Sequence, residues 1–166
     1  MRKVRVGVSS NYCDPNMPIL NYTTEITAEK TVAQIQAMLC KAKALAIMNE
    51  YADGVLARLN FRIATPYGLM TYQLPANIDK IHALIQRDSR VPQRLKTREQ
   101  AARVGWRILK DWLEAQLALI EAGMVELPQV FLPYAQDKTG ATLYEVLKDR
   151  KFAGLALPER AAEKRD

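Results

Sequence analysis

Hydrophobic positions recur with two different periods along this chain. In its first half they alternate with a period of two in three segments, residues 44–50, 55–65 and 69–74, which predicts three strands. Asp53-Gly54 and the segment 65–68 are typical of tight turns, so the strands are expected to form an antiparallel meander. A meander of this kind packs helices on one face and leaves the other face open to water or to a partner.

The segment before the meander predicts a strand and then a helix. Residues 18–26, PILNYTTEI, are typical of a strand, and Thr27 is a favourable N-cap for a helix over residues 27–44. Residues 1–16 contain another alternating stretch, VRVGV, followed by turn-forming residues. They are either an extension that precedes a translation start at Met17 or an extra edge strand, and the pattern leaves both alternatives open.

Helical periodicity dominates the second half. Asn77 is the expected N-cap of a short helix that ends near residue 88, and Pro92 interrupts the basic linker 89–96 that follows it. After the long helix described below, a short helical turn over residues 127–135 is expected. The last predicted helix follows at residues 142–151.

The longest helix is predicted to begin after Thr97 and to end at Gly123. Thr97 and Gln100 form a capping-box pattern, and Gly123 suits the C′ position. The apolar arc covers more than half of the circumference, which is typical of a helix that is buried on several sides. Trp106 and Trp112 are therefore expected in the core and not as stacking platforms.

These elements together predict the α+β class. The expected order is strand, helix, three-stranded antiparallel meander, helix, and a helical C-terminal half built on one long helix. We expect a single domain over residues 17–158, divided into a β-rich half (17–88) and a helical half (97–158), with a charged tail at 159–166. A chain of 166 residues is long enough for one substantial core.

Composition changes this picture mainly through the distribution of charge. With 49% hydrophobic and 25% charged residues the chain is typical of a globular protein and unlike a disordered one. The net charge of +6 equals the net charge of the window 87–110 alone, because residues 1–86 carry +3 and residues 111–166 carry −3. The basic residues of that window are Arg87, Arg90, Arg94, Lys96, Arg98, Arg103, Arg107 and Lys110. A basic segment of this kind attracts polyanions, among which nucleic acid is the commonest in a cell.

The charges of the long helix run against its dipole. Arg107 with Asp111, and Lys110 with Glu114, form ordinary i,i+4 pairs. The cations that precede them have few acidic neighbours in sequence, and cations in the first turn of a helix are unfavourable. This conflict favours phosphate binding, since the guanidinium group grips phosphate with two hydrogen bonds. The alternative is that acidic side chains from residues 111–166 fold over the segment and neutralise it.

The expected nucleic-acid contacts are therefore the eight basic residues of the window. We add Arg58 and Arg62, which share the polar face of the central strand. Contacts of this type supply affinity for phosphates and do not read the base sequence.

No catalytic constellation is recognisable. His82 is the only histidine, the two cysteines are far apart, and no glycine-rich phosphate loop follows a strand, so we predict a non-enzymatic protein without metal or cofactor. Cys13 and Cys40 are expected to be reduced thiols, with Cys40 buried on its helix, and a single disulfide between them is the alternative.

Several stretches resemble a family of small, uncharacterised proteins encoded by bacteriophages and prophages. They are MPILNYTTEI, TVAQIQAML, QAARVGWRILKDWLEAQLALIEAGM, VFLPYA and LALPE, and the similarity runs from about Met17 to Pro158. The resemblance implies a phage gene product in the cytoplasm of a bacterial host and assigns no functional residue. The order helix, meander, helix also resembles the double-stranded-RNA-binding domain, in element order alone.

Three functional hypotheses follow. The first is a phage accessory protein that binds DNA or RNA, single- or double-stranded, through the basic linker and the start of the long helix. The second is an inhibitor or adaptor of a host defence protein, which would use the open sheet face with Leu56 and the second tryptophan stripe. The third is a protein that sequesters a nucleotide messenger with the same arginines. Apolar runs are too short to predict a membrane span, and self-association stays open.

Overall fold

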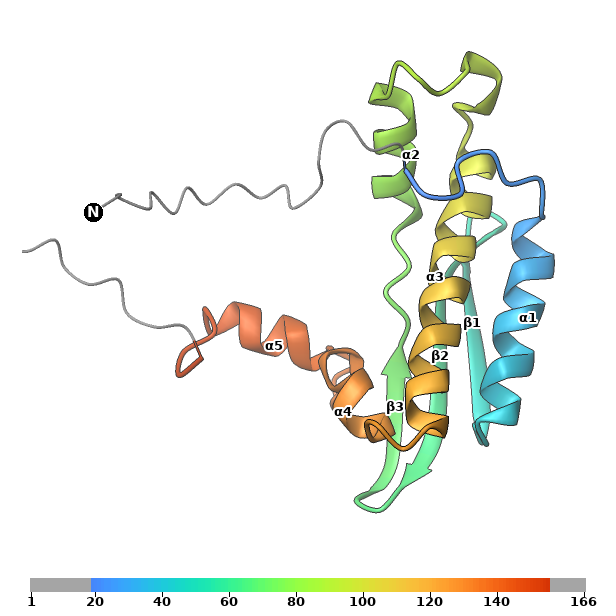
Figure 1. Ribbon diagram of the computed structural model, residues 1–166. Helices are drawn as coiled ribbons and strands as arrows, with labels where there is room; N and C mark the ends of the chain where they lie inside the picture. Colours follow the sequence, from blue (N-terminus) through green and yellow to red (C-terminus); the bar gives the residue numbers. More distant parts are fainter. Residues whose placement is uncertain (1–18, 156–166) are drawn as a thin grey trace, which may run out of the picture.

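The computed structural model describes residues 19–155, which form a three-stranded sheet and a set of helices (Figure 1). Along the chain the elements are α1 (Ala28–Lys41), β1 (Ala46–Ala52), β2 (Val55–Thr65), β3 (Gly68–Gln73), α2 (Ile78–Arg87), η1 (Gln93–Leu95), α3 (Arg98–Glu121), α4 (Leu127–Phe131), η2 (Leu132–Tyr134) and α5 (Leu143–Asp149). This arrangement confirms the predicted α+β class. The predicted extension or edge strand at 1–16 and the charged tail at 159–166 lie outside the described residues.

The strand β2 is the centre of an antiparallel meander with the order β1-β2-β3. Ile47 pairs with Phe61 on one side, and Phe61 pairs with Tyr72 on the other. The first turn is the predicted one: Asp53 and Gly54 have φ values of 52° and 75°. Positive φ at both positions is what a two-residue hairpin with the right-handed strand twist requires.

A β-bulge changes the face to which the start of β2 belongs. Glu50 pairs with Arg58 but Tyr51 pairs with Leu56, so Ala57 is the extra residue. The shift turns Leu56 into the core, where only 7% of it is exposed. Strict alternation places Leu56 on the open face, and that expectation is wrong because the bulge interrupts the alternation.

The helix α3 runs across one face of the sheet, with α1 on one side and α2 on the other (Figure 1). A glycine permits the close approach of α2. A Cβ atom added at Gly105 would lie 2.9 Å from Cδ1 of Ile78. The helix therefore contacts both neighbours as well as the sheet, which explains why its apolar arc is so wide.

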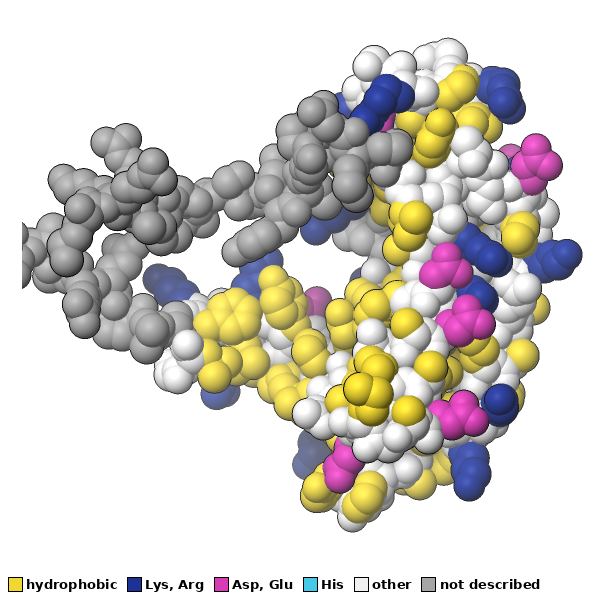
Figure 2. All heavy atoms as spheres, viewed as in Figure 1, with side chains coloured by type: hydrophobic (Ala, Val, Ile, Leu, Met, Phe, Trp, Pro, Cys, Tyr) yellow, Lys and Arg dark blue, Asp and Glu magenta, His cyan; other side chains and the backbone are white. Residues whose placement is uncertain are grey.

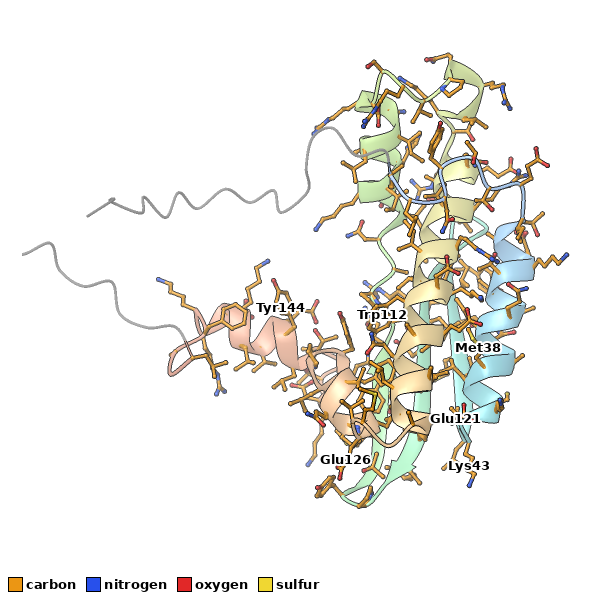
Figure 3. The ribbon with its side chains drawn as sticks, in the orientation of Figure 1. Met38, Lys43, Trp112, Glu121, Glu126 and Tyr144 are labelled. Atoms are coloured by element: carbon orange, nitrogen blue, oxygen red, sulfur yellow. The ribbon has the colours of Figure 1, made fainter. Side chains whose placement is uncertain are left out.

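Aromatic side chains from three segments form one end of the core. Phe61 stacks on Tyr72 with ring centroids 5.3 Å apart, and Phe131 of α4 meets both rings. Trp112 lies between α3 and the α4 segment (Figure 3) and contacts Phe131 edge to face at 5.7 Å. Trp106 is fully buried. The prediction that the tryptophans belong to the core is confirmed for Trp106, whereas Trp112 is partly buried and packs against the core.

The chain after α3 covers the edge of β3. Ala135 forms a bridge with Tyr72, and the backbone N–H of Gln136 donates to the carbonyl of Thr71 at 2.8 Å. The helix α5 then projects away from the sheet, and Tyr144 lies on this arm (Figure 3). Its predicted capping box is present, since Thr142 and Glu145 each cap the other's backbone N–H.

The strand predicted for residues 18–26 is wrong over its described part, which is a turn and irregular chain. Its apolar residues that pack on the core, Ile19 and Tyr22, are three positions apart and do not alternate. The Nε2 group of Gln100 donates to the carbonyls of Tyr22 and Thr24 at 2.9 and 3.0 Å. Backbone groups that a strand would use are thus held by a side chain of α3.

The same contact corrects the capping box predicted for α3. Thr97 does cap the helix, because its hydroxyl accepts from the backbone N–H of Gln100 at 3.1 Å. The side chain of Gln100, however, is buried and points to the preceding turn segment and not back to Thr97. At the other end Gly123, with φ 71°, occupies the predicted C′ position.

Cys40 is exposed and its thiol is free, so the prediction of a buried thiol is wrong. The apolar stripe of α1 is narrow, and the buried residues Val32, Ile35 and Leu39 leave Cys40 one position past the stripe. Cys13 lies outside the described residues.

We predict that Gln100→Met lowers the free energy of unfolding by about 1–3 kcal/mol. Methionine fills a similar volume but leaves the carbonyls of Tyr22 and Thr24 without their donor. Urea denaturation measures the change. The matched control is Gln116→Met, a partly exposed position on the same helix. Equal stabilities of the two variants would contradict the role assigned to Gln100.

Candidate nucleic-acid interface

Five cations gather where α2 ends and α3 begins. The C-terminal turn of α2, η1 and the first turn of α3 form one end of the molecule (Figure 1). We call this region the basic end, and its cations are Arg87, Arg90, Arg94, Lys96 and Arg98. They come from the most basic part of the sequence, so the question is how many of them are neutralised in the fold.

Asp88 neutralises Arg90. The guanidinium group donates from Nε to Oδ1 at 2.9 Å and from Nη2 to Oδ2 at 2.8 Å, and the backbone N–H of Arg90 also donates to Oδ1 at 2.9 Å. These hydrogen bonds to the charged form lower the pKa of Asp88 to about 2. The pair therefore stays ionised over the whole physiological range.

Two further arginines meet acidic groups from the first turns of helices. Arg98 contacts Asp79 of α2 at 2.6 Å, and Arg103 contacts Glu99 at 2.5 Å. Asp79 and Glu99 both lie in the first turn of their helices, where a carboxylate is favourable. Arg98 is the one cation of the basic end that lies in such a turn itself. Asp79 offsets the unfavourable position of Arg98.

Farther along α3 the predicted i,i+4 pairs are present. Arg107 lies 3.7 Å from Asp111 and also donates to Gln34 of α1 at 3.3 Å. Lys110 lies 2.5 Å from Glu114. Figure 2 shows basic and acidic side chains interspersed over the face formed by α3 and α1. This stretch is a mixed-charge surface and does not attract a polyanion strongly.

Three cations of the window form no ion pair with any carboxylate among residues 19–155. They are Arg87, Arg94 and Lys96, and all three belong to the basic end. Arg87 and Arg94 are exposed. Lys96 donates from Nζ to the carbonyl of Gln86 at 3.0 Å, in the last turn of α2. Within the window 87–110, the cations that form no ion pair are therefore confined to the basic end.

The two predicted arginines of β2 lie in different places. Arg58 pairs with Glu50 at 3.3 Å and lines a pocket of about 220 Å³ together with Arg98 and Asp79. Arg62 donates from Nε to the hydroxyl of Thr71 at 3.2 Å and lines neither of the two pockets near α3. The structure thus brings Arg58 close to the basic end and leaves Arg62 on the open face of the sheet.

A second pocket, of about 300 Å³, lies on the other side of Arg98. It is enclosed by the first turns of α1 and α3 and by the hairpin of β1 and β2, and Arg98 and Arg103 reach its rim. Its polar lining includes Gln36, Asn49 and Tyr51, none of which is among the predicted contacts. Only Asn49 leaves a signal in the sequence, because it is a polar residue at a core-facing position of an alternating strand.

Other chemistry is sparse in the described part of the chain. No group of three or more His, Cys, Asp or Glu side chains is arranged to hold a metal ion there. His82 lies 3.1 Å from the amide nitrogen of Gln86 on the exposed side of α2. None of the helices over residues 19–155 is long and apolar enough to span a membrane.

Comparison with known proteins found no matching family model, no matching curated protein and no matching solved structure. The assignment of a function therefore depends on the geometry and charge of the chain itself.

We predict that the carboxyl group of Asp88 titrates near pH 2 in the folded protein and that Arg90→Gln raises its pKa toward the usual value of about 3.9. Because the pKa of Asp88 is lowered by folding, the stabilisation from this carboxylate is complete above about pH 4. It is lost as the pH falls toward 2. Carbon-detected NMR titration of the carboxyl groups measures both values. Arg94→Gln is the control and should leave the titration of Asp88 unchanged, whereas a wild-type midpoint at or above 3.9 would contradict the geometry.

Proposed function

We propose that this protein is a non-enzymatic accessory protein that binds nucleic acid through phosphate contacts at the basic end. The observation that supports the proposal most directly is that Arg87, Arg94 and Lys96 all belong to the basic end and form no ion pair in the described part of the chain, although Lys96 is close enough to Asp88 to help lower the pKa of that carboxyl group. Cations left unpaired on one surface create a local positive potential that attracts a polyanion.

The chemistry of these cations favours phosphate over other anions. Arginine presents a planar fork that donates two hydrogen bonds to neighbouring phosphate oxygens. Contacts of this kind would hold the backbone of a nucleic acid without reading its sequence. Arg98 and Arg58 lie where they can extend the surface, since their ion pairs with the exposed carboxylates of Asp79 and Glu50 exchange readily for contacts with phosphate. Arg90 is held by the mostly buried carboxylate of Asp88 and would contribute less.

The adaptor hypothesis has less support than it had from the sequence. Leu56 is buried and Trp112 packs against Phe131, so neither offers an apolar contact to a partner protein. The resemblance to phage-encoded proteins leads us to propose that the protein acts in the cytoplasm of a phage-infected or lysogenic bacterium. Its nucleic-acid target would then belong to the phage or to the host.

The proposal predicts that the triple variant Arg87→Gln, Arg94→Gln, Lys96→Gln weakens binding to a labelled oligonucleotide and flattens its salt dependence. Each lost phosphate contact should reduce the slope of log K against log salt concentration by about 0.9 for a duplex, so the slope should fall by about 2 to 3. Fluorescence anisotropy at several salt concentrations measures both quantities. Glutamine at position 96 keeps a donor for the carbonyl of Gln86.

The matched control removes three exposed lysines elsewhere, in Lys30→Gln, Lys138→Gln, Lys148→Gln. This variant has the same net charge as the test variant, so it separates a local phosphate site from a general effect of charge. Equal loss of affinity in both variants would show that the basic end is not the site. Absence of salt-dependent binding in the wild-type protein would refute nucleic-acid binding altogether.

A further inference from the structure

The pocket of about 300 Å³ has an apolar floor and a polar rim. Val32 of α1, Leu56 of β2 and Ala102 of α3 are all buried and form part of the floor. Side chains with hydrogen-bonding groups, Gln36 and Asn49 among them, line the same space. A small, largely apolar cavity with a few polar groups is the usual form of a site for a flat organic ligand.

Asn49 is not explained by the folding of the sheet. It pairs with Leu59 in the register of β1 and β2, so it occupies a core-facing position between apolar neighbours. Its Oδ1 atom is buried and has no hydrogen-bond partner among the described residues. A buried amide oxygen without a donor is unfavourable, and such groups in folded proteins usually have a functional reason. Because no hydrogen bond fixes Oδ1, the amide can turn toward a donor that enters the pocket.

An exposed aromatic side chain stands beside the pocket. Tyr51 is 66% exposed although it belongs to β1, and it lines the pocket at the end nearest the hairpin turn. A tyrosine ring held on a strand and open to solvent is a suitable stacking surface for another ring.

The pocket is continuous with the basic end through Arg98. This arginine lines the pocket and lies two residues after Lys96, which forms no ion pair within residues 19–155. Arg98 at the rim of the pocket and Lys96 in the preceding linker therefore carry positive charge at two nearby positions along the chain. That extent suits the repeated phosphates of a strand better than the compact phosphate group of a free nucleotide.

We infer that the pocket takes one unstacked nucleobase of a single-stranded nucleic acid whose backbone crosses the basic end. The inference rests on the proposed function and adds a preference for single strands. A base has two apolar faces and a polar edge, which match the apolar floor, the ring of Tyr51 and the amide of Asn49. A base inside an intact duplex cannot reach such a pocket, so the duplex would be held by phosphate contacts alone.

The test uses the full chain and measures anisotropy with labelled single-stranded and double-stranded oligonucleotides of equal length at one salt concentration. The pocket is narrowed by Ala33→Trp, at an exposed position of α1 that lines it. The matched control is Ala37→Trp, which is exposed one helical turn farther along and lies outside the pocket. Tyr51→Ala removes the stacking surface. Circular dichroism confirms that each variant is folded.

The expected result is tighter binding of the single strand by the wild-type protein. Ala33→Trp should bring single-strand affinity down to duplex affinity, leaving the duplex affinity and its salt slope unchanged, and Ala37→Trp should behave as wild type. Tyr51→Ala should weaken single-strand binding by about 5- to 150-fold. Equal wild-type affinity for both forms, with steep salt dependence, would overturn the base pocket and leave the proposed function intact.

A competition experiment distinguishes a single strand from a free mononucleotide as the ligand that supplies the base. If a mononucleotide displaces the labelled strand only at concentrations far above those of the unlabelled strand, the strand is the ligand. The single-strand inference is overturned by a combination of two results. A mononucleotide would bind tightly and lose this binding in Ala33→Trp, and single strands would bind no better than duplex. Failure of every oligonucleotide to bind would refute the proposed function as well.

Discussion

The burial of α3 is the constraint on which the rest of the structure depends. The helix packs against α1, α2 and the sheet, and its buried residues occur on most of its circumference. Only a narrow polar arc reaches water, and cations and anions must share it. Along most of the helix they neutralise each other as Arg103 with Glu99 and Lys110 with Glu114 do. The cations of the window that form no ion pair, Arg87, Arg94 and Lys96, all come before the helix begins.

The cations around the start of α3 are explained by contacts with α2 as well as by α3 itself. Taken alone, α3 has cations at the wrong end for its dipole. In the fold, Arg98 in its first turn pairs with Asp79 in the first turn of α2, and the linker before it reaches the last turn of α2, whose carbonyls carry partial negative charge. Arg87 lies in that last turn, and Lys96 donates to the carbonyl of Gln86. Lys96 thus precedes the N-terminus of α3, where a cation is unfavourable, and its hydrogen bond to the last turn of α2 is favourable.

The sequence predicted those features that depend on neighbouring residues, and it failed where distant residues meet. The turn at Asp53-Gly54, the N-caps Thr27, Asn77 and Thr97, and the end of α3 at Gly123 follow from local backbone preferences. The bulge at Ala57 depends on cross-strand register, and the turn over residues 19–26 depends on Gln100, more than seventy positions away. The pocket combines three such segments, which is why Tyr51 and Gln36 carried no signal in the linear pattern.

The acidic groups that line the pocket distinguish it electrostatically from the adjoining basic end. Glu29 and Glu99 line the pocket, and carboxylates there repel phosphate at its rim. Glu99 is paired with Arg103, but Glu29 has no cation partner within residues 19–155. A carboxylate can accept hydrogen bonds from the amino group of a base, whereas it disfavours a phosphodiester. In the proposed complex, this charge distribution would direct the backbone of a bound strand to the basic end and its base to the pocket, with Arg98 at the boundary between them.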